Sequence, residues 1–280
     1  MKSVARLYVS CALAEDGTVA LAEAQSHYIT RVMRCVVGDT LRLFNGRDGE
    51  WIAEISDIQK RETLLHVRKL HAPQRNSPPM TLCFAPPRGG RIDSIIEKAT
   101  ELGASVLQPV AMQFSVVDKI NPEKWAATVR EAAEQCERMD LPEIRPMVSL
   151  ATLLGGWDEN VPLIYGDESG GSERFGEERG GQRPEARDQN NREISSQTLS
   201  SYRPPASGLW PPLQSWALLI GPEGGFSDEE HALLARARAA RGVSLGPRIL
   251  RVDTACITLM ALTLQAWGDW ELKPHFRKQP

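Results

Sequence analysis

The stretch Leu218-Leu219-Ile220-Gly221-Pro222-Glu223-Gly224-Gly225-Phe226-Ser227 decides the fold class of this chain. An apolar run ends there in a glycine-rich turn, and Ser227 with Glu230 forms a capping pattern that starts a helix. A strand that stops in such a turn presents backbone N–H and C=O groups at the carboxyl edge of a sheet, where open α/β sheets bind ligands. Three glycines in five residues also allow close approach to the backbone. We therefore predict a small-molecule site that includes Leu219, Ile220, Gly221, Pro222, Glu223, Gly224 and Gly225.

A second stretch repeats this pattern: Leu245-Gly246-Pro247-Arg248-Ile249-Leu250-Arg251-Val252-Asp253-Thr254-Ala255. It also lies between an apolar run and the start of a helix, so we expect both turns to line one pocket beside a polar reaction centre. Two simpler interpretations stay open: Gly246-Pro247 forms only a turn, and Asp253 only caps the last helix. The binding residues expected from this stretch are Leu245, Gly246, Arg248, Ile249 and Leu250.

Length and composition limit the possible classes of protein. The 280 residues suffice for two domains, and 41% hydrophobic with 25% charged residues is typical of a globular protein. The net charge of −3 argues against a generic polyanion binder, so any nucleic-acid contact must be confined to local basic patches. The five cysteines are scattered singly, which favours a reducing compartment and predicts no metal site or disulfide. No segment is long and apolar enough to span a bilayer, and we expect a cytoplasmic protein.

The chain changes character near residue 73. Residues 1–72 contain four alternating runs that predict strands, hairpin turns at Asn45-Gly46 and Asp48-Gly49, and one helix around residues 27–34. We interpret this part as a small β-barrel. A proline-rich linker is expected at residues 73–79.

After the linker, predicted strands alternate with helices, which implies a mainly parallel sheet in an α/β domain over residues 80–280. Asn121-Pro122-Glu123 is a typical helix start, with Asn as the N-cap and Pro at the first helical position. The last helix is apolar nearly all round, so it should be buried against the sheet or against a second subunit. The strands are predicted at 80–84, 106–110, 161–165 and 217–220, and the helices at 91–102, 121–138 and 254–267.

Residues 167–212 interrupt this alternation. This segment is rich in charged residues, glycine, proline and serine, and it holds few large apolar side chains. It cannot bury enough surface to offset the entropy of ordering it, so we predict a disordered insertion.

The familiar dinucleotide, P-loop, zinc-protease and nucleophile-elbow motifs are absent from the sequence. Glu97 and Glu101 lie four residues apart on one helix, where they are either two solvated acids or acids paired by another group. Arg138 stands at the end of a helix, a position where an arginine usually interacts with the helix dipole.

Taken together, five separated stretches resemble the RsmE family of bacterial 16S ribosomal RNA methyltransferases, which methylate N3 of a uridine and belong to the SPOUT superfamily. The resemblance covers nearly the whole chain except the insertion. It implies an N-terminal PUA-like RNA-binding barrel, a C-terminal domain with a deep trefoil knot, S-adenosylmethionine as methyl donor, and a homodimer with active sites at the subunit interface. The stretches are His27–Arg34 with Val37-Gly38-Asp39, Glu97–Gly103, Glu134–Arg138 with Leu141–Ile144, and the two glycine-bearing turns.

From the chemistry of methyl transfer we hypothesise roles for particular residues. Arg138 would face the target base as an electrostatic stabiliser, and Glu223 or Asp253 would accept the proton of uridine N3. Arg88 and Asp253 depart from the lysine and glutamate that the family usually has there, which preserves charge but changes reach. Basic residues expected to contact RNA are Arg31, Arg34, Arg42 and Arg88.

Two alternatives remain at this stage. One is a related knotted methyltransferase that acts on another RNA position, because the donor site does not specify the base. The other is a non-enzymatic RNA-binding or ribosome assembly factor with a degenerate site. In each case the expected partner is the small ribosomal subunit or another RNA.

Overall fold

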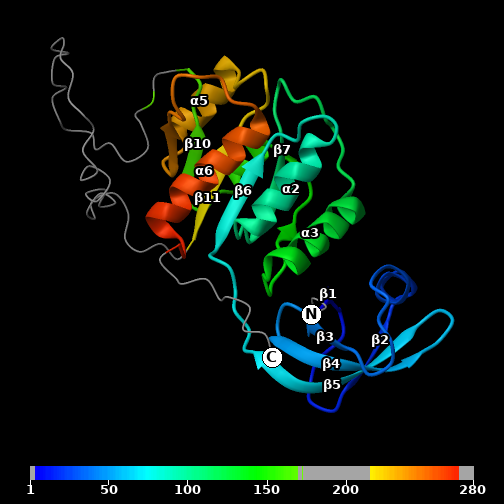
Figure 1. Cartoon of the computed structure of the whole chain (residues 1–280). Coiled ribbons are helices and arrows are strands. Elements are labelled where there is room, and N and C mark those ends of the chain that lie inside the picture. Colours follow the sequence, from blue (N-terminus) through cyan, green and yellow to red (C-terminus); the bar gives the residue numbers. More distant parts are fainter. Residues whose placement is uncertain (1–3, 170–171, 173–214, 271–280) are drawn as a thin grey trace, which may run out of the picture. The chain divides into compact units, whose positions relative to one another are not determined.

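The computed structural model describes residues 4–169, 172 and 215–270 (Figure 1). Most of the predicted insertion at 167–212 lies outside the described residues. The chain divides into two compact units, which are described separately below. The first comprises Met1–Leu82, Arg88–Gln108 and Asp118–Met147, and the second comprises Cys83–Pro87, Pro109–Val117 and Val148–Pro280.

The first unit contains a five-stranded sheet whose strand order is β1-β3-β4-β5-β2. Its alternating residues point into one apolar core, in which Leu41, Leu43, Ala53, Ile55 and Leu65 are fully buried. This confirms the four strands that alternation predicted, because each of the four runs forms a strand with one buried face. The strands are β1 (Arg6–Tyr8), β2 (Thr18–Leu21), β3 (Thr40–Phe44), β4 (Glu50–Ile58) and β5 (Thr63–Ala72).

The helix expected at 27–34 has a different form. Helix α1 (Glu23–His27) begins four residues earlier and continues into a π-helical turn, η1 (Tyr28–Val32). The Thr30 hydroxyl donates to the Ser26 carbonyl, and Ile29 is fully buried in the core of the sheet. A wider turn is a common adjustment at functional segments, and sequence periodicity does not reveal it.

The rest of the first unit includes two helices that begin close to the predicted residues. Helix α2 (Arg91–Glu101) packs against α3 (Pro122–Cys136), and both bury their apolar faces. The Asn121 side chain accepts a hydrogen bond from the Lys124 backbone N–H at 3.0 Å, as an N-cap should. Strand β8 (Glu143–Ile144) pairs in parallel with β7 (Val106–Ala111).

The larger sheet has the strand order β12-β10-β11-β6-β7-β8, and β9 also pairs with β7. In the second unit β10 pairs in parallel with both β11 and β12. The prediction of an α/β fold with a mainly parallel sheet is therefore confirmed. The remaining elements are β6 (Met80–Phe84), β9 (Val148–Ser149), α4 (Leu150–Gly155), β10 (Leu163–Gly166), β11 (Trp216–Ile220), α5 (Asp228–Arg236), β12 (Ala240–Val243) and α6 (Val252–Trp267).

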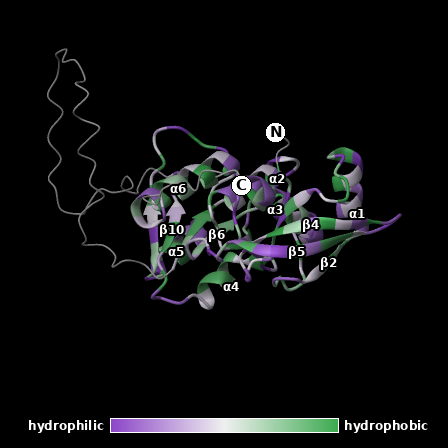
Figure 2. Ribbon diagram, turned by 60° about the horizontal axis from the view of Figure 1, so that its bottom comes forward, coloured by the Kyte–Doolittle hydropathy of each residue, from purple (hydrophilic) through white to green (hydrophobic). Residues whose placement is uncertain are grey.

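Helix α6 packs against β11 (Figure 1), which confirms the sheet as one partner of this apolar helix. Figure 2 colours the helix by the hydropathy of its residues. Leu259, Met260 and Leu264 are buried there, and the rings of Trp216 and Trp267 meet edge to face at 6.4 Å. Within the described ranges, no helix has the length and apolarity needed to cross a membrane.

The predicted capping box at the start of α5 is present. The Glu230 backbone donates to the Ser227 hydroxyl at 3.2 Å, and the Ser227 backbone donates to the Glu230 carboxylate at 2.9 Å. The other oxygen of Glu230 accepts from the Gln113 backbone N–H at 2.8 Å. The cap therefore also ties the loop after β7 to α5.

We expect Ser227→Ala to lower the free energy of unfolding by about 1 kcal/mol, because it removes the acceptor for one helix N–H. Urea unfolding measures the change. Ser10→Ala, at an exposed serine outside any helix, is the control and should leave the free energy of unfolding unchanged. Equal stability of the two variants would contradict the importance of the cap.

Candidate active site

A cavity of about 290 Å³ opens at the carboxyl ends of β10, β11 and β12 in the second unit. Since these strands are parallel neighbours, the loops that follow them emerge at one edge of the sheet. Both predicted glycine-bearing turns therefore line one cavity. The lining residues are Gly166, Asp167, Glu168, Ile220, Gly221, Pro222, Glu223, Gly225, Ser244, Leu245, Gly246, Pro247, Arg248, Ile249, Leu250, Val252 and Ala255.

Two predicted binding residues do not line this cavity. Leu219 is fully buried in the apolar core beneath it. Gly224 packs against Phe114, whose Cβ would lie 2.9 Å from a Cβ added at residue 224. Leu219 therefore contributes to the core, and Gly224 allows the turn to pack against Phe114.

Backbone geometry explains the glycine at residue 225. Its φ is +75°, and an added Cβ would lie 2.3 Å from the Glu168 carboxylate oxygen. Gly246 in the other turn has a φ of +104°. Side chains other than glycine rarely adopt these angles, so both turns depend on glycine.

The turn after β12 exposes both backbone and side chain. The N–H groups of Arg248, Ile249 and Leu250 make no backbone hydrogen bond within the described part of the chain. The side chain of Ile249 is 93% exposed, although it is large and apolar. Backbone donors and an apolar side chain at the mouth of a cavity can contact a ligand or a partner surface.

Sequence reasoning missed two acidic residues of the cavity wall, Asp167 and Glu168. The Glu168 carboxylate accepts from the Phe226 backbone N–H at 3.0 Å, so it holds the glycine-rich turn in place. Burial raises the pKa of Asp167, but hydrogen bonds from Ser172 and Ser169 outweigh it and lower the pKa overall. The composition of the insertion concealed both residues, whereas their position just after a predicted strand could have revealed them.

The two candidate proton acceptors differ in their surroundings. Glu223 is exposed and lines the cavity. Asp253 lies in the first turn of α6 between the lining residues Val252 and Ala255. Its Oδ1 is buried and has no hydrogen-bond partner among the described residues. The N-cap of α6 is Arg251, so Asp253 is inside the helix rather than at its cap.

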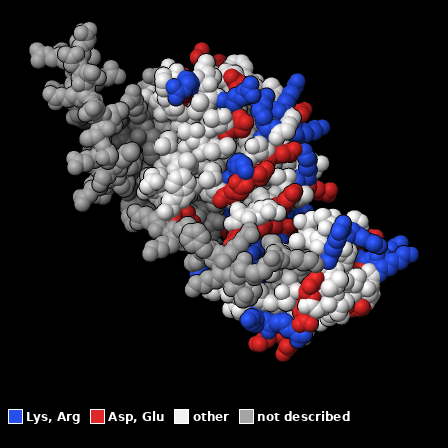
Figure 3. Space-filling view, viewed as in Figure 1, with Lys and Arg blue, Asp and Glu red and all other residues white. Residues whose placement is uncertain are grey.

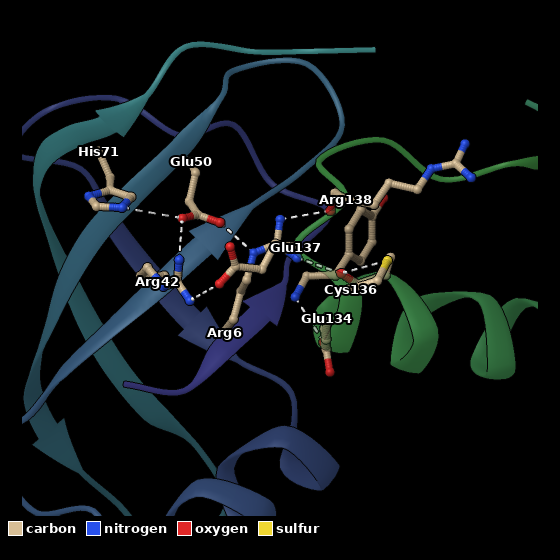
Figure 4. Close-up of polar contacts among 10 residues, drawn as sticks. Arg6, Arg42, Glu50, His71, Glu134, Cys136, Glu137 and Arg138 are labelled. Atoms are coloured by element: carbon tan, nitrogen blue, oxygen red, sulfur yellow. Dashed lines mark hydrogen bonds and ion pairs between the residues drawn. The ribbon is translucent and has the colours of Figure 1, made fainter. Parts of the chain in front are cut away.

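Arg138 lies in the first unit, two residues after α3 ends, and is 8% exposed (Figure 4). Its guanidinium donates to the Thr100 carbonyl at 2.9 Å and to both carboxylate oxygens of Asp140 at 3.1 and 3.0 Å. Burial raises the pKa of Asp140, but the bonds from Arg138 and Ser77 outweigh it and lower the pKa overall. Arg138 is therefore a charged, oriented side chain.

Glu97 and Glu101 of α2 are paired acids. The Lys98 ammonium contacts the Glu97 carboxylate at 2.8 Å and the Glu101 carboxylate at 2.9 Å. The hydrogen bonds that the Lys98 ammonium donates to both carboxylates raise the pKa of Lys98.

The four predicted RNA-binding arginines have unlike surroundings. Arg31, Arg34 and Arg88 are exposed, and Figure 3 shows basic side chains on the part of the first unit that carries α1 and the β4–β5 hairpin. Arg34 does not continue the helical face of Arg31, because its φ is +56°. Arg42 is instead held in ion pairs with Glu50 at 3.1 Å and Glu137 at 2.9 Å, and its side chain is 13% exposed.

Comparison with known families assigns both parts of the chain. Residues 74–264 match the RNA methyltransferase domain family, and residues 21–67 match the RNA methyltransferase PUA domain family. The chain is therefore an RNA methyltransferase that carries a PUA domain.

The curated relatives narrow this class. The ribosomal RNA small subunit methyltransferase E of Rickettsia conorii is 30% identical over 91% of this chain and 93% of its own length. The enzyme of that name from Synechocystis is 34% identical over 91% of this chain and 76% of its own. The chain belongs to the ribosomal RNA small subunit methyltransferase E family.

Solved structures agree with this assignment. A Legionella pneumophila methyltransferase in complex with the bound cofactor S-adenosylmethionine matches with a TM-score of 0.74 and 27% identity, over 95% of this chain and 99% of that one. The Neisseria gonorrhoeae ribosomal RNA small subunit methyltransferase E, at 24% identity and a TM-score of 0.74 over 96% and 100% of the two chains, has the same fold. S-adenosylmethionine is the cofactor of this family.

We expect Gly225→Ala to weaken S-adenosylmethionine binding by about tenfold or more, because a positive φ strains alanine and its Cβ would collide with Glu168. Calorimetric titration measures the Kd. Gly155→Ala is the control, since nothing lies within 4 Å of a Cβ at that position. Wild-type affinity in Gly225→Ala would contradict a role for this turn in cofactor binding.

We also expect Glu168→Ala to raise the Kd by about tenfold, because it removes a charged acceptor from the Phe226 N–H and frees the turn. The same titration applies. Glu229→Ala, an exposed acid on α5, should bind like the wild type. If the two variants have the same Kd, Glu168 has no part in the site.

Proposed function

We propose that this protein transfers the methyl group of S-adenosylmethionine to N3 of a uridine in 16S ribosomal RNA of the small ribosomal subunit. The observation that carries the proposal is the cavity in which both glycine-bearing turns meet. Family membership and the names of the curated relatives support small-subunit RNA as the substrate.

The residues of the cavity fit this cofactor. Its volume of about 290 Å³ is close to the lower limit of the range for small-molecule pockets, roughly 300–1,000 Å³. The sulfonium and ammonium groups of the cofactor are cationic, and Asp167, Glu168 and Glu223 supply negative charge to the wall. Arg248 can form an ion pair with the carboxylate of the cofactor. The backbone N–H groups of Ile249 and Leu250 can donate hydrogen bonds to the base of the cofactor.

The protein contributes position and charge to the reaction. When bound, S-adenosylmethionine supplies an electrophilic methyl group. Uridine N3 carries a proton, so the chain must accept that proton or stabilise the anion formed when it leaves. Arg138 would stabilise negative charge on the ring oxygens, because its guanidinium is permanently charged and oriented by Asp140.

Glu223 and Asp253 are the candidate proton acceptors. The exposed Glu223 can reach a bound base from the cavity mouth, whereas the unpartnered buried Oδ1 of Asp253 has capacity to accept a hydrogen bond. Replacement of the true acceptor should slow methylation most at low pH, and the loss should shrink as pH rises, because more uridine is then already deprotonated.

Measured pH–rate profiles of Glu223→Gln and Asp253→Asn distinguish the two residues. We expect one variant to show this pH-dependent loss and the other to follow the wild-type profile. Wild-type profiles in both variants would exclude direct proton acceptance by either side chain.

We further propose the finer organisation that the resemblance implies. Residues 1–72 would form a PUA-like barrel, 73–79 a linker, and 80–280 a knotted methyltransferase domain that functions in the cytoplasm as a homodimer. The almost fully exposed Ile249 supports a second copy that covers it. Arg31, Arg34 and Arg88 would contact RNA, whereas the ion pairs of Arg42 favour a structural role.

Methylation of small subunits by purified protein, followed by mass mapping of the nucleosides, tests the substrate and the modified position. The expected product is N3-methyluridine in 16S RNA. A methylated nucleoside of another kind would support a related enzyme that acts at another RNA position. No transfer despite cofactor binding would support an assembly factor.

We expect Arg138→Ala to lower the rate of methyl transfer about 100-fold or more while the Kd for S-adenosylmethionine stays unchanged. Single-turnover transfer to small subunits measures the rate. Arg145→Ala, at an exposed arginine paired with Glu143, is the control, and circular dichroism checks the fold. An unchanged rate in Arg138→Ala would remove this arginine from the mechanism.

A further inference from the structure

Arg6 connects the five-stranded sheet of the first unit to the end of helix α3 (Figure 4). Its side chain is only 3% exposed and forms an ion pair with Glu50, which is equally buried. The same guanidinium donates to the Ala133 carbonyl at 2.6 Å and to the Arg138 carbonyl at 2.7 Å. It also stacks over the Phe44 ring at 3.8 Å from the centroid.

These contacts supply what α3 lacks. The last carbonyls of a helix have no partners within it, and a cation near them interacts favourably with the helix dipole. The last turn of α3 contains no basic residue of its own. Arg6 therefore caps the helix from β1, more than 120 residues away in the sequence.

Glu50 extends the link to a second arginine. Its other carboxylate oxygen accepts from Arg42 at 3.1 Å, and Arg42 also bonds Glu137 at 2.9 Å. Glu137 is the C-cap of α3, with a left-handed φ of +64°. The Tyr8 backbone N–H donates to Glu134 at 2.9 Å. The end of α3 is thus held by residues of β1, β3 and β4.

The backbone carbonyl and the guanidinium of Arg138 are therefore both held in place. Its carbonyl accepts from Arg6, while its guanidinium is held by Thr100 and Asp140. Burial lowers the pKa of Arg6, the Glu50 carboxylate opposes this shift, and an arginine stays charged throughout the physiological range. A buried charge of this kind requires its partner. The charged cluster of Arg6, Arg42, Glu50 and Glu137 therefore has few alternative arrangements.

We infer that Arg6 and Glu50 are positioning residues for catalysis: they make the placement of Arg138 depend on the sheet of the RNA-binding part. The inference rests on the proposed role of Arg138. The mechanism needs Arg138 aligned with the developing charge on the base, and misplacement by about 1 Å can cost about 100-fold in rate. The cluster provides this alignment through Arg6, Arg42 and Glu50, which belong to the five-stranded sheet.

The test compares Arg6→Lys and Glu50→Gln with a matched exposed pair on the same sheet. Lysine keeps the charge but cannot reach three acceptors with a planar fork. We expect each variant to lower kcat on small subunits about tenfold, with less than a twofold change in KM and an unchanged Kd for S-adenosylmethionine. The control variants Arg68→Lys and Glu54→Gln change a pair 3.0 Å apart whose side chains are 49% and 36% exposed, and they should behave like the wild type.

A further variant, Glu137→Gly, separates an effect on kcat from an effect on the stability of the fold. Glu137→Gly removes the second carboxylate partner of Arg42, and glycine readily adopts the left-handed φ of this residue. We expect the melting temperature to stay at or above that of the wild type while kcat falls. Combining Arg6→Lys with Arg138→Ala should slow transfer no more than Arg138→Ala alone, because both changes act through one side chain.

The outcomes separate the two proposals. If Arg138→Ala is slow but Arg6→Lys and Glu137→Gly retain wild-type kcat, the positioning role is overturned and the proposed function stands. The positioning role is also overturned if Arg6→Lys and Glu50→Gln change KM rather than kcat. It is overturned as well if Arg6→Lys slows transfer further in a protein that already carries Arg138→Ala. If Arg138→Ala keeps the wild-type rate, both the catalytic assignment of Arg138 and the positioning role fail.

Discussion

The parallel pairing of β10 with β11 and β12 is the constraint on which the cavity of the second unit depends. Parallel neighbours end at one edge, so three loops that are far apart in the sequence converge there. One loop carries Asp167 and Glu168, and the other two carry the glycine-bearing turns. The pairing converts separate sequence motifs into one cavity.

Within that cavity, main chain and carboxylates have complementary tasks. Gly225 and Gly246 adopt left-handed angles in the wall of the cavity, a conformation that glycine takes readily. Glu168 then holds the first turn through the Phe226 N–H and adds negative charge to the wall. Such a wall favours a cationic ligand over a neutral one.

The first unit uses buried charge for a different purpose. Helix α3 ends without a basic residue in its last turn, and Arg6 supplies the missing cation from β1. Glu50 neutralises Arg6 and also binds Arg42, which in turn binds Glu137. Arg42, which we expect to contact RNA, also pairs with two carboxylates of this cluster. A basic residue in a hairpin looks the same in sequence whether it faces solvent or an acid from another element.

The sequence by itself determined the local features: the strand ends before Gly221, the Asn121 cap, the Ser227–Glu230 capping box and the alternation that implies a parallel sheet. These features depend on near neighbours, whose chemistry a short window contains. The π-helical turn after α1, the cavity position of Glu168 and the burial of Arg6 were decided only by the tertiary structure. Their partners lie up to 132 residues away, and no local pattern specifies which distant carbonyl or N–H group a charged side chain will meet.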